Sequence, residues 1–169
     1  PYLGQLLERH PVQGKGLLEL ACGTGTVAIA MAEAGWRVYG VDGSAQMLAH
    51  ARRQADEAGA NVWFSQQDMR SFVLPQRVDL VTCLYDSLNY LLTAEDLQAT
   101  FVRVAAALKP DGLFERIEET HIERAYPERT IVAALDRSGL QVLDRYECFT
   151  TDPPTSRSPR ILWIATPTP

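Results

Sequence analysis

A glycine-rich segment between an apolar run and a helical pattern limits the fold of this 169-residue chain more than any other feature. The apolar run is Leu17–Ala21, and the helical pattern is Thr26–Ala34, which stops at Gly35. Between them lie Gly23 and Gly25, whose missing side chains permit a tight turn and a close approach of the backbone to a ligand. This order predicts a βα unit with a ligand site beyond the carboxyl end of the strand.

Strands and helices continue to alternate along the chain, as in a doubly wound sheet. We predict strands at Trp36–Val41, Asn61–Ser65, Val78–Leu84, Gln141–Cys148 and Arg160–Ala165, and helices at Ser44–Ala58, Thr93–Leu108 and Glu128–Ser138. Ser44 and Thr93 are typical N-cap residues, and Gly59 lies just past the end of the helix that Ser44 begins. The last two strands are joined by a short loop, which favours an antiparallel pair at a sheet edge. The predicted fold is α/β, with a mostly parallel sheet, helices on both faces and an antiparallel C-terminal strand pair.

The segment that follows the predicted helix Thr93–Leu108 breaks this regular order. Lys109–Gly112 has the composition of a turn. After it, Leu113 and Phe114 run at once into the charged residues that begin at Glu115. Two apolar residues are too few for a central strand, so either the lid of this protein is pared down or residues are missing. We expect a single domain over residues 1–169 from which a lid segment is missing near 114–116, with the fifth strand continuing beyond Phe114 in the intact protein. The chain also begins at Pro1 without an initiator Met, which suggests a trimmed piece.

Composition narrows the class of partner. The formal net charge is -5, and the densest basic cluster is Arg52-Arg53, so no nucleic-acid partner is expected. No apolar run is long enough to span a membrane, and we expect a cytoplasmic protein. Cys22, Cys83 and Cys148 lie far apart, without the spacing of a metal site, and should be reduced and buried.

Two acidic residues flank the glycine loop and bear on the identity of the ligand. Asp42 follows the second strand at the spacing of a carboxylate that accepts both ribose hydroxyls. Gly23–Ala28 satisfies the G-x-G-x-x-A form of the dinucleotide fingerprint, so NAD(P) is one candidate. Glu19 favours a different ligand, because a carboxylate there repels a pyrophosphate but suits the ammonium and sulfonium of S-adenosylmethionine.

Several segments together resemble the class I, Rossmann-like S-adenosylmethionine-dependent methyltransferases, in particular small bacterial members of unassigned substrate. They are Leu18–Gly25 with Val38–Ser44, then Gln67-Asp68-Met69, Asp79–Leu91 and Leu108–Phe114. The last resembles the L-K-P-G-G turn of the family, with Asp111 in place of one glycine. The resemblance is good from Leu3 to Phe114 and loose beyond.

The resemblance implies S-adenosylmethionine as the cofactor and a role for each matching residue. Glu19 would hold the methionine amino group, directly or through water, and Asp42 the ribose hydroxyls. Asp68 would accept from the adenine amino group, which we favour over the alternative of a surface turn residue. Met47 would either pack on the adenine or fill the core. The full implied cofactor set is Glu19, Ala21, Cys22, Gly23, Gly25, Asp42, Gly43, Met47, Asp68, Met69 and Cys83.

The methyl acceptor is expected beside the end of the fourth strand. The candidate catalytic residues are Tyr85, Asp86, Asn89 and His121, which would line the acceptor pocket or orient the nucleophile. For Asn89 a turn role is the alternative, and His121 on a surface strand is the blander interpretation. Tyr90 is expected to pack under the next helix. His10 and His50 are expected to face solvent.

The sequence therefore predicts an enzyme that methylates a small-molecule acceptor, as a monomer or homodimer. Two other functions stay open. One is a nicotinamide oxidoreductase, which shares Gly23, Gly25 and Asp42 but leaves Glu19 without a role. The other is a non-catalytic S-adenosylmethionine-binding protein.

Overall fold

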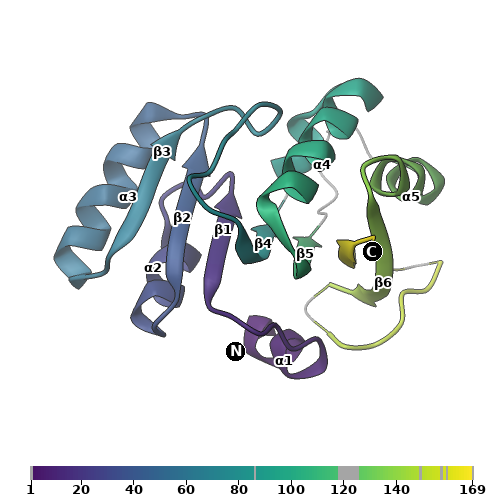
Figure 1. Cartoon of the computed structure of the whole chain (residues 1–169), viewed down its shortest axis with the longest axis horizontal. Helices are drawn as coiled ribbons and strands as arrows, with labels where there is room; N and C mark the ends of the chain where they lie inside the picture. The colour runs from purple at the N-terminus through teal and green to yellow at the C-terminus, as the bar shows by residue number, and fades with distance from the viewer. Residues whose placement is uncertain are drawn as a thin grey trace.

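The alternation of strands and helices forms one seven-stranded sheet in the order β3-β2-β1-β4-β5-β7-β6 (Figure 1). The computed structural model describes residues 2–85, 87–117, 126–148, 150–156, 158 and 160–168. Its elements are α1 (Tyr2–Arg9), β1 (Gly16–Leu20), α2 (Thr26–Glu33), β2 (Arg37–Asp42), α3 (Ala45–Ala58), β3 (Val62–Gln66), β4 (Val78–Cys83), the 3-10 helix η1 (Ser87–Tyr90), α4 (Ala94–Ala107), β5 (Leu108–Ile117), α5 (Glu128–Arg137), β6 (Leu140–Glu147) and β7 (Ile161–Pro167).

Strand direction confirms the predicted fold class. The strands from β3 to β5 pair in parallel. β7 runs antiparallel to both of its neighbours, β5 and β6, so the predicted antiparallel C-terminal pair is present at one edge of the sheet. Because the parallel strands share one direction, their carboxyl ends meet at a single edge, where ligands of open α/β sheets bind.

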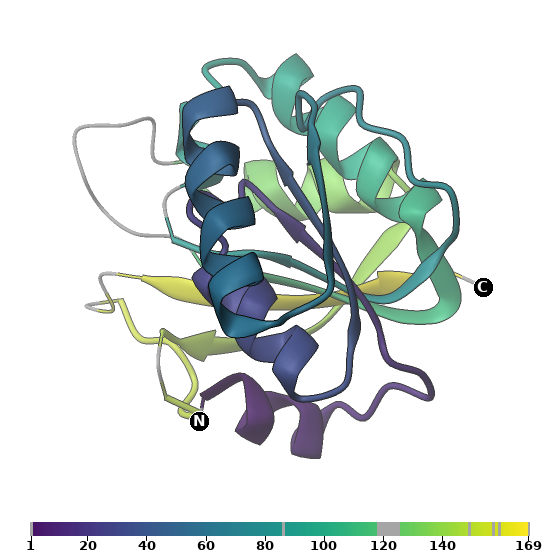
Figure 2. The same cartoon turned by 90° about the vertical axis from the view of Figure 1, so that its left-hand side faces the viewer.

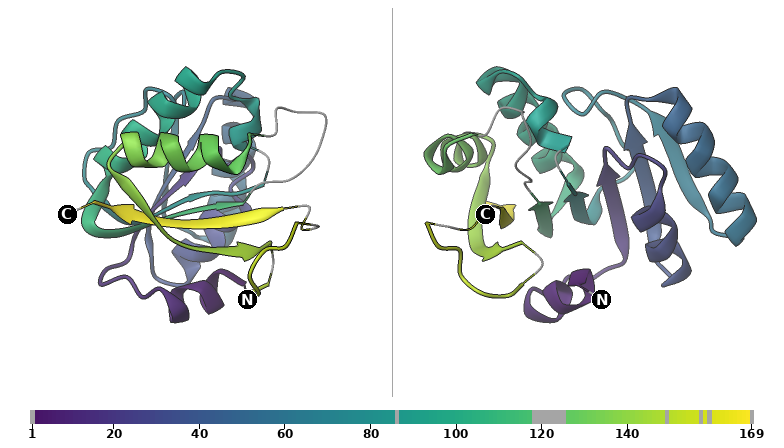
Figure 3. Two further views of the ribbon diagram at one scale, coloured as in Figure 1. Left: turned by 90° about the vertical axis from the view of Figure 1, so that its right-hand side faces the viewer. Right: turned by 180° about the vertical axis from the view of Figure 1, so that it is seen from behind.

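Helices cover both faces of the sheet (Figures 2 and 3). The sheet therefore separates two clusters of buried side chains, one on each face. On one face, α4 and α5 contribute Phe101 and Ile131, which pack with Val81 of β4. On the other face, α1 and α2 contribute Leu6 and Ala28. α3 packs against β3 and α2. All six residues of β4 are buried, as expected for a central strand covered on both sides.

Local signals set the ends of the helices as predicted. The Ser44 hydroxyl accepts a hydrogen bond from the Met47 backbone N–H at the start of α3. The Thr93 hydroxyl accepts one from Asp96 at the start of α4. Each cap satisfies a backbone donor that has no partner within the helix. α3 ends at Gly59, whose φ of 65° is left-handed.

The fifth strand continues beyond Phe114, as Leu108–Ile117. β5 spans 10 residues and pairs with β4 as far as Arg116 and with β7 as far as Ile117. Backbone hydrogen bonds to two neighbours hold the strand, so it does not need a long apolar run. The predicted turn at Lys109–Gly112 lies within an irregular start of the strand, where the register with β4 shifts. The missing lid segment near 114–116 stays a prediction.

Two further predictions for isolated side chains have different outcomes. His10 does not face solvent freely, because its Nε2 atom lies 2.8 Å from the hydroxyl oxygen of Tyr146 on β6. Leu6 of α1 packs into the same core cluster as Tyr146, and this holds His10 close to Tyr146. The sequence analysis did not predict α1. His50 is exposed, as predicted. None of the three cysteines forms a disulfide among the described residues, and all three are buried, also as predicted.

Candidate functional site

The loop after β1 adopts an unusual backbone conformation at the carboxyl edge of the sheet. Ala21, Gly23 and Gly25 have φ values of 52°, 53° and 77°, in the left-handed region. Glycine adopts this region without strain, whereas alanine does so rarely and at a cost. The loop therefore reverses direction within a few residues and delivers the chain to the N-terminus of α2, where Gly25 is the N-cap.

The glycines around this loop serve two different purposes. A Cβ atom at Gly25 would lie 2.9 Å from the ring of Phe64, and one at Gly40 would lie 2.6 Å from the same ring. These two glycines are required by packing. A Cβ at Gly23 or Gly43 would meet no protein atom within 4 Å. The space in front of these two residues is thus open to a ligand.

Asp42 at the end of β2 connects the loop that contains Gly23 to the segment that contains Gly43. Its Oδ2 atom accepts a hydrogen bond of 2.8 Å from the Gly23 N–H, and its Oδ1 atom accepts one of 2.7 Å from the Ser44 N–H. A carboxylate has about four lone-pair positions, so both oxygens retain capacity to accept from a ligand. The contact fixes the carboxylate beside the glycine loop.

Glu19 is the most unusual ionisable group of the site. It lies on β1, is 4% exposed, and accepts a hydrogen bond from the Ala28 backbone in the first turn of α2. Within the described part of the chain, its Oε2 atom and the Oγ1 atom of Thr82, the residue paired with it on β4, have no hydrogen-bond partner. Burial, with a contribution from the charge of Asp42, raises the pKa of Glu19 to about 8. Such a buried carboxyl is suited to a cationic partner.

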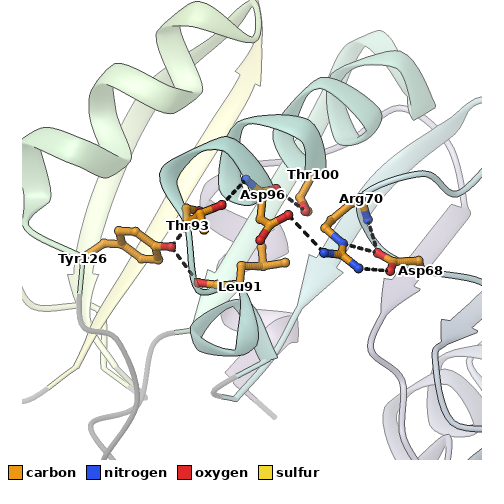
Figure 4. Close-up of polar contacts among 7 residues, drawn as sticks. All are labelled: Asp68, Arg70, Leu91, Thr93, Asp96, Thr100 and Tyr126. Atoms are coloured by element: carbon orange, nitrogen blue, oxygen red, sulfur yellow. Dashed lines mark hydrogen bonds and ion pairs between the residues drawn. The ribbon is translucent and has the colours of Figure 1, made fainter.

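A cavity of about 510 Å³ opens beside the end of β3. Its lining is formed by Gly43, Gln66, Gln67, Asp68, Met69, Arg70, Tyr90 and Leu91. The volume falls within the range of small-molecule pockets. The carboxylate of Asp68 is forked by the guanidinium of Arg70, which also pairs with Asp96 at the start of α4 (Figure 4). This hydrogen bonding to Arg70 lowers the pKa of Asp68 to about 2.

The end of β4 presents aromatic side chains to solvent. Tyr85 has a φ of 59° and is 58% exposed. Tyr90 is 72% exposed and lines the cavity, so the expectation that it packs under the next helix is wrong. Asn89, by contrast, is buried at 3% exposure within η1. The tight turn of η1 buries Leu88 and Asn89 and leaves Tyr90 exposed, which the sequence does not specify.

Comparison with known proteins identifies the chain at this point. The sequence profile of a family described as a methyltransferase domain matches residues 17–112, more than half of the chain. The chain belongs to the class I S-adenosylmethionine-dependent methyltransferases. It shares the cofactor of that family, and the expectation of a nicotinamide oxidoreductase is set aside.

Individual relatives and solved structures resemble this methyltransferase to different degrees. It is 39% identical over 123 residues, 71% of the chain, to YqeM of Bacillus subtilis, which is named provisionally as a methyltransferase. It is 38% identical over 111 residues, 66% of the chain, to dTDP-3-amino-3,6-dideoxy-alpha-D-glucopyranose N,N-dimethyltransferase of Streptomyces fradiae. The matches cover 49% and 42% of these relatives, so the chain spans about half of their length or less.

The fold is also found in a crystal structure of an S-adenosylmethionine-dependent methyltransferase from Clostridium acetobutylicum. The TM-score is 0.93 at 20% sequence identity, over 99% of this chain and 90% of the other. The sheet and its helices are therefore those of the methyltransferase fold.

Most of the residues expected to bind cofactor lie at the carboxyl edge of the methyltransferase sheet or in the loops that follow it. Met47 is 45% exposed on α3, which excludes the alternative of a core side chain. Met69 is partly buried and lines the cavity. Cys22 and Cys83 are buried, and burial together with the charge of Glu19 raises the pKa of the Cys22 thiol, so it stays protonated. Asp86 and His121 lie outside the described residues.

Sequence analysis missed three polar residues of this methyltransferase site. Arg70 and Asp96 flank the cavity, and Thr82 lies beside Glu19. The one available signal was the spacing of Asp68 and Arg70 within a short loop, which allows a local fork between the two side chains. Asp96 was interpreted only as part of a helix N-terminus, and Thr82 only as part of an apolar strand.

Proposed function

We propose that this domain transfers the methyl group of S-adenosylmethionine to a small-molecule nucleophile held beyond the end of β4. The observation that carries the proposal is the buried Glu19 carboxyl, with Oε2 unpartnered among the described residues, next to a glycine loop that Asp42 holds in place. A dinucleotide pyrophosphate gives no reason to bury an acid at this point, whereas an amino acid ammonium does.

The methionine end of the cofactor would be bound around Glu19. The carboxylate would accept from the ammonium, directly or through water, and the hydroxyl of Thr82 is next to it in the strand register. The opposite charge would offset the desolvation of the acid. Backbone groups of Ala21, Cys22, Gly23, Gly25 and Cys83 would contact the methionine and ribose portions.

The adenosine end would extend from Asp42 into the cavity. Asp42 retains acceptor capacity for the ribose hydroxyls, and the open space at Gly43 lies next to it in sequence. The adenine would lie between Met69 and the exposed side chain of Met47, with its amino group donating to Asp68. The contributions of Gly43 and Met69 to the cavity lining support this direction.

The acceptor would be held by the segment that follows β4. In the transfer, a lone pair of the acceptor forms a bond to the methyl carbon while the bond from that carbon to sulfur breaks, and its electron pair stays on sulfur. Positioning supplies much of the rate in such a displacement. Tyr85 would wall the acceptor site, and Asp86 would orient the nucleophile or take its proton. The burial of Asn89 favours a role in holding η1 over direct contact with the acceptor.

The acceptor that we propose to test first is a small primary or secondary amine. The Streptomyces fradiae relative is named for N,N-dimethylation of an amino sugar, which supports this choice. His121 is the candidate base for an acceptor that carries a proton. We further propose that the protein acts in the cytoplasm, as a monomer or homodimer. No helix in the described ranges has both the length and the apolarity to cross a membrane.

The experiment that tests the proposal is a search for methylated product. The protein is incubated with S-adenosylmethionine and a panel of small amines, alcohols and thiols, and methylated products are detected by mass spectrometry. We expect product from at least one amine, and a loss of turnover in Asp86→Ala that is much larger than its loss of cofactor affinity. Cofactor binding without product from any acceptor would support the non-catalytic alternative.

A further inference from the structure

Arg70 lines the cavity and pairs with two carboxylates, those of Asp68 and Asp96 (Figure 4). It is not among the residues that the family resemblance implies as cofactor contacts. Its backbone N–H and its Nε atom both donate to Oδ1 of Asp68, at 2.8 Å and 2.9 Å, and its Nη2 donates to Oδ2. The remaining terminal nitrogen, Nη1, donates to Oδ1 of Asp96 at 3.0 Å. One guanidinium thus joins the loop after β3 to the first turn of α4.

The Arg70 contacts leave Asp68 with little freedom. A planar guanidinium that forks a carboxylate fixes its position and its plane, which a single ammonium does not do. Of the roughly four lone-pair positions of the carboxylate, two on Oδ1 and one on Oδ2 are then used. Acceptor capacity remains on Oδ2 alone.

The rest of the loop is ordered around this pair. The Gln67 side-chain carbonyl accepts from the Val73 N–H at 2.8 Å, and its amide nitrogen donates to the Val73 carbonyl at 3.2 Å. Gln67 therefore closes the loop that carries Asp68 and Arg70. Folding stability does not account for the fork, because the side chains of Arg70 and Asp68 are 46% and 44% exposed, and exposed ion pairs add little to stability.

We propose that Arg70 is a positioning and specificity-determining residue, which holds Asp68 as a fixed acceptor for the 6-amino group of adenine. The inference rests on the proposed function, in which Asp68 receives that amino group. Asp68 is ionised at every physiological pH, with or without the lowering of its pKa by Arg70, so it accepts hydrogen bonds and never donates one, and the part of Arg70 is to fix its position. The site therefore selects a 6-amino purine and disfavours a 6-oxo purine, whose oxygen faces a carboxylate without a proton between them.

The test compares S-adenosylhomocysteine with S-inosylhomocysteine, which carries an oxygen in place of the amino group. Dissociation constants for both are measured by calorimetry on the intact chain. We expect the unaltered protein to prefer the adenosyl compound by at least about tenfold, the typical worth of a charge-assisted hydrogen bond. Arg70→Ala should lower this preference to about twofold, mainly by weakening the adenosyl compound.

Two variants separate the effect of the two-point contact with Asp68 from the effect of the positive charge and from a general loss of structure. Arg70→Lys keeps the charge without the fork and should recover less than half of the lost preference on a logarithmic scale. Arg53→Ala removes an exposed arginine whose side chain is 2.7 Å from His50 on the same helix, and it should change neither constant. A structural defect alone would weaken both compounds equally and leave their ratio unchanged.

The possible outcomes distinguish a failure of this inference from a failure of the proposed function on which it rests. If Asp68→Ala leaves the preference intact, Asp68 is not the adenine acceptor, and that part of the proposed function is wrong. If Asp68→Ala abolishes the preference but Arg70→Ala retains it in full, the positioning role of Arg70 is wrong while the proposed function stands. Full recovery by Arg70→Lys would show that charge alone suffices and would also overturn the positioning role.

Discussion

At the scale of the residue, Glu19 is buried, and no cationic side chain pairs with it among the residues that the structure describes. Its pKa is raised to about 8, chiefly by desolvation, so the acid is largely protonated near neutral pH in the ligand-free protein. An ammonium beside it would favour the carboxylate, and binding would then release a proton. Both the folding equilibrium and the binding equilibrium should therefore depend on pH through this one group.

We predict that the affinity for S-adenosylhomocysteine, which keeps the amino acid ammonium, rises with pH and levels off near pH 8. Below the pKa of Glu19, each unit of pH should change the dissociation constant by up to about tenfold. Calorimetry in buffers of different ionisation enthalpy should detect close to one proton released per ligand near pH 7. Glu19→Gln should bind more weakly and without this dependence. A flat pH profile for the unaltered protein would remove Glu19 from the ammonium site.

The same acid predicts a trend in stability. The folded-state pKa of Glu19 lies above its ordinary value of 4.5, so the folded protein holds more protons than the unfolded chain between about pH 4.5 and pH 8. Its contribution to stability is complete below that window and is lost as the pH rises through it. Urea denaturation of Glu19→Gln should therefore show a shallower fall in the free energy of unfolding across the window. An equal slope in both proteins would contradict the shift.

Asp42 gives a second prediction at this scale. Asp42→Ala should weaken S-adenosylmethionine binding by about 1.5–3 kcal/mol, the usual worth of hydrogen bonds to a charged group. Part of the loss will arise because the Gly23 and Ser44 N–H groups lose their acceptor. Asp56→Ala, which removes an exposed acid from α3, is the control. Unchanged affinity in calorimetry would show that Asp42 is not the ribose ligand.

At the scale of the element, the junction of β1 and α2 depends on glycine for reasons that lie elsewhere in the fold. Gly25 is left-handed, and it also faces Phe64 of β3 and Ala51 of α3. The packing of α2 against α3 and the conformation of the loop are thus determined at one residue. A sequence motif shows the glycine but not the aromatic ring that requires it.

We predict that Gly25→Ala destabilises the domain more than Gly59→Ala. Both positions have a positive φ and should lose about 1–2 kcal/mol through the left-handed backbone. Only Gly25 has close neighbours, with a Cβ 2.9 Å from Phe64, and overpacking should add about 1–3 kcal/mol. The free energies of unfolding in urea provide the comparison. Equal losses at the two positions would show that α2, α3 and β3 move apart freely at this junction.

Elements whose signals are local could be predicted from the sequence, and those fixed by distant contacts could not. The caps at Ser44 and Thr93 and the glycine stop at Gly59 are local, and all three are confirmed. β5 is held by backbone pairing on both sides, so a count of its apolar residues could not give its full length beyond Phe114. Asn89 is buried and Tyr90 is exposed because both lie in η1, and no periodicity in the sequence predicts this short helix.

At the scale of the whole molecule, sheet order and site agree because parallel strands place their ends together. The order β3-β2-β1-β4 brings the loop with Asp68, the end of β2 with Asp42 and the loop with Gly23 to one edge. The alternation of strands and helices was sufficient to predict this edge. The ion pair between Arg70 and Asp96 could not be predicted in this way, because it joins a loop to the first turn of α4 over 26 residues of sequence.

Cofactor selectivity is a property of the folded molecule and can be measured as such. A ligand that binds only the folded state raises the free energy of unfolding by about 2.7 kcal/mol at a concentration 100 times its dissociation constant. We expect S-adenosylmethionine to raise the melting temperature of this protein and NAD at equal concentration to leave it unchanged. Stabilisation by NAD would mean that the glycine loop also accepts a pyrophosphate.

The position of β7 has a consequence for the order in which the protein can be made. β7 is the last strand in the chain, yet it lies between β5 and β6. A ribosome synthesises β6 before its neighbour exists, so β6 has no strand to join until β7 has emerged. The parallel strands that carry the glycine loop and Asp42 are complete much earlier. The cofactor edge can therefore form earlier in synthesis, while the far edge of the sheet must wait until β7 has emerged.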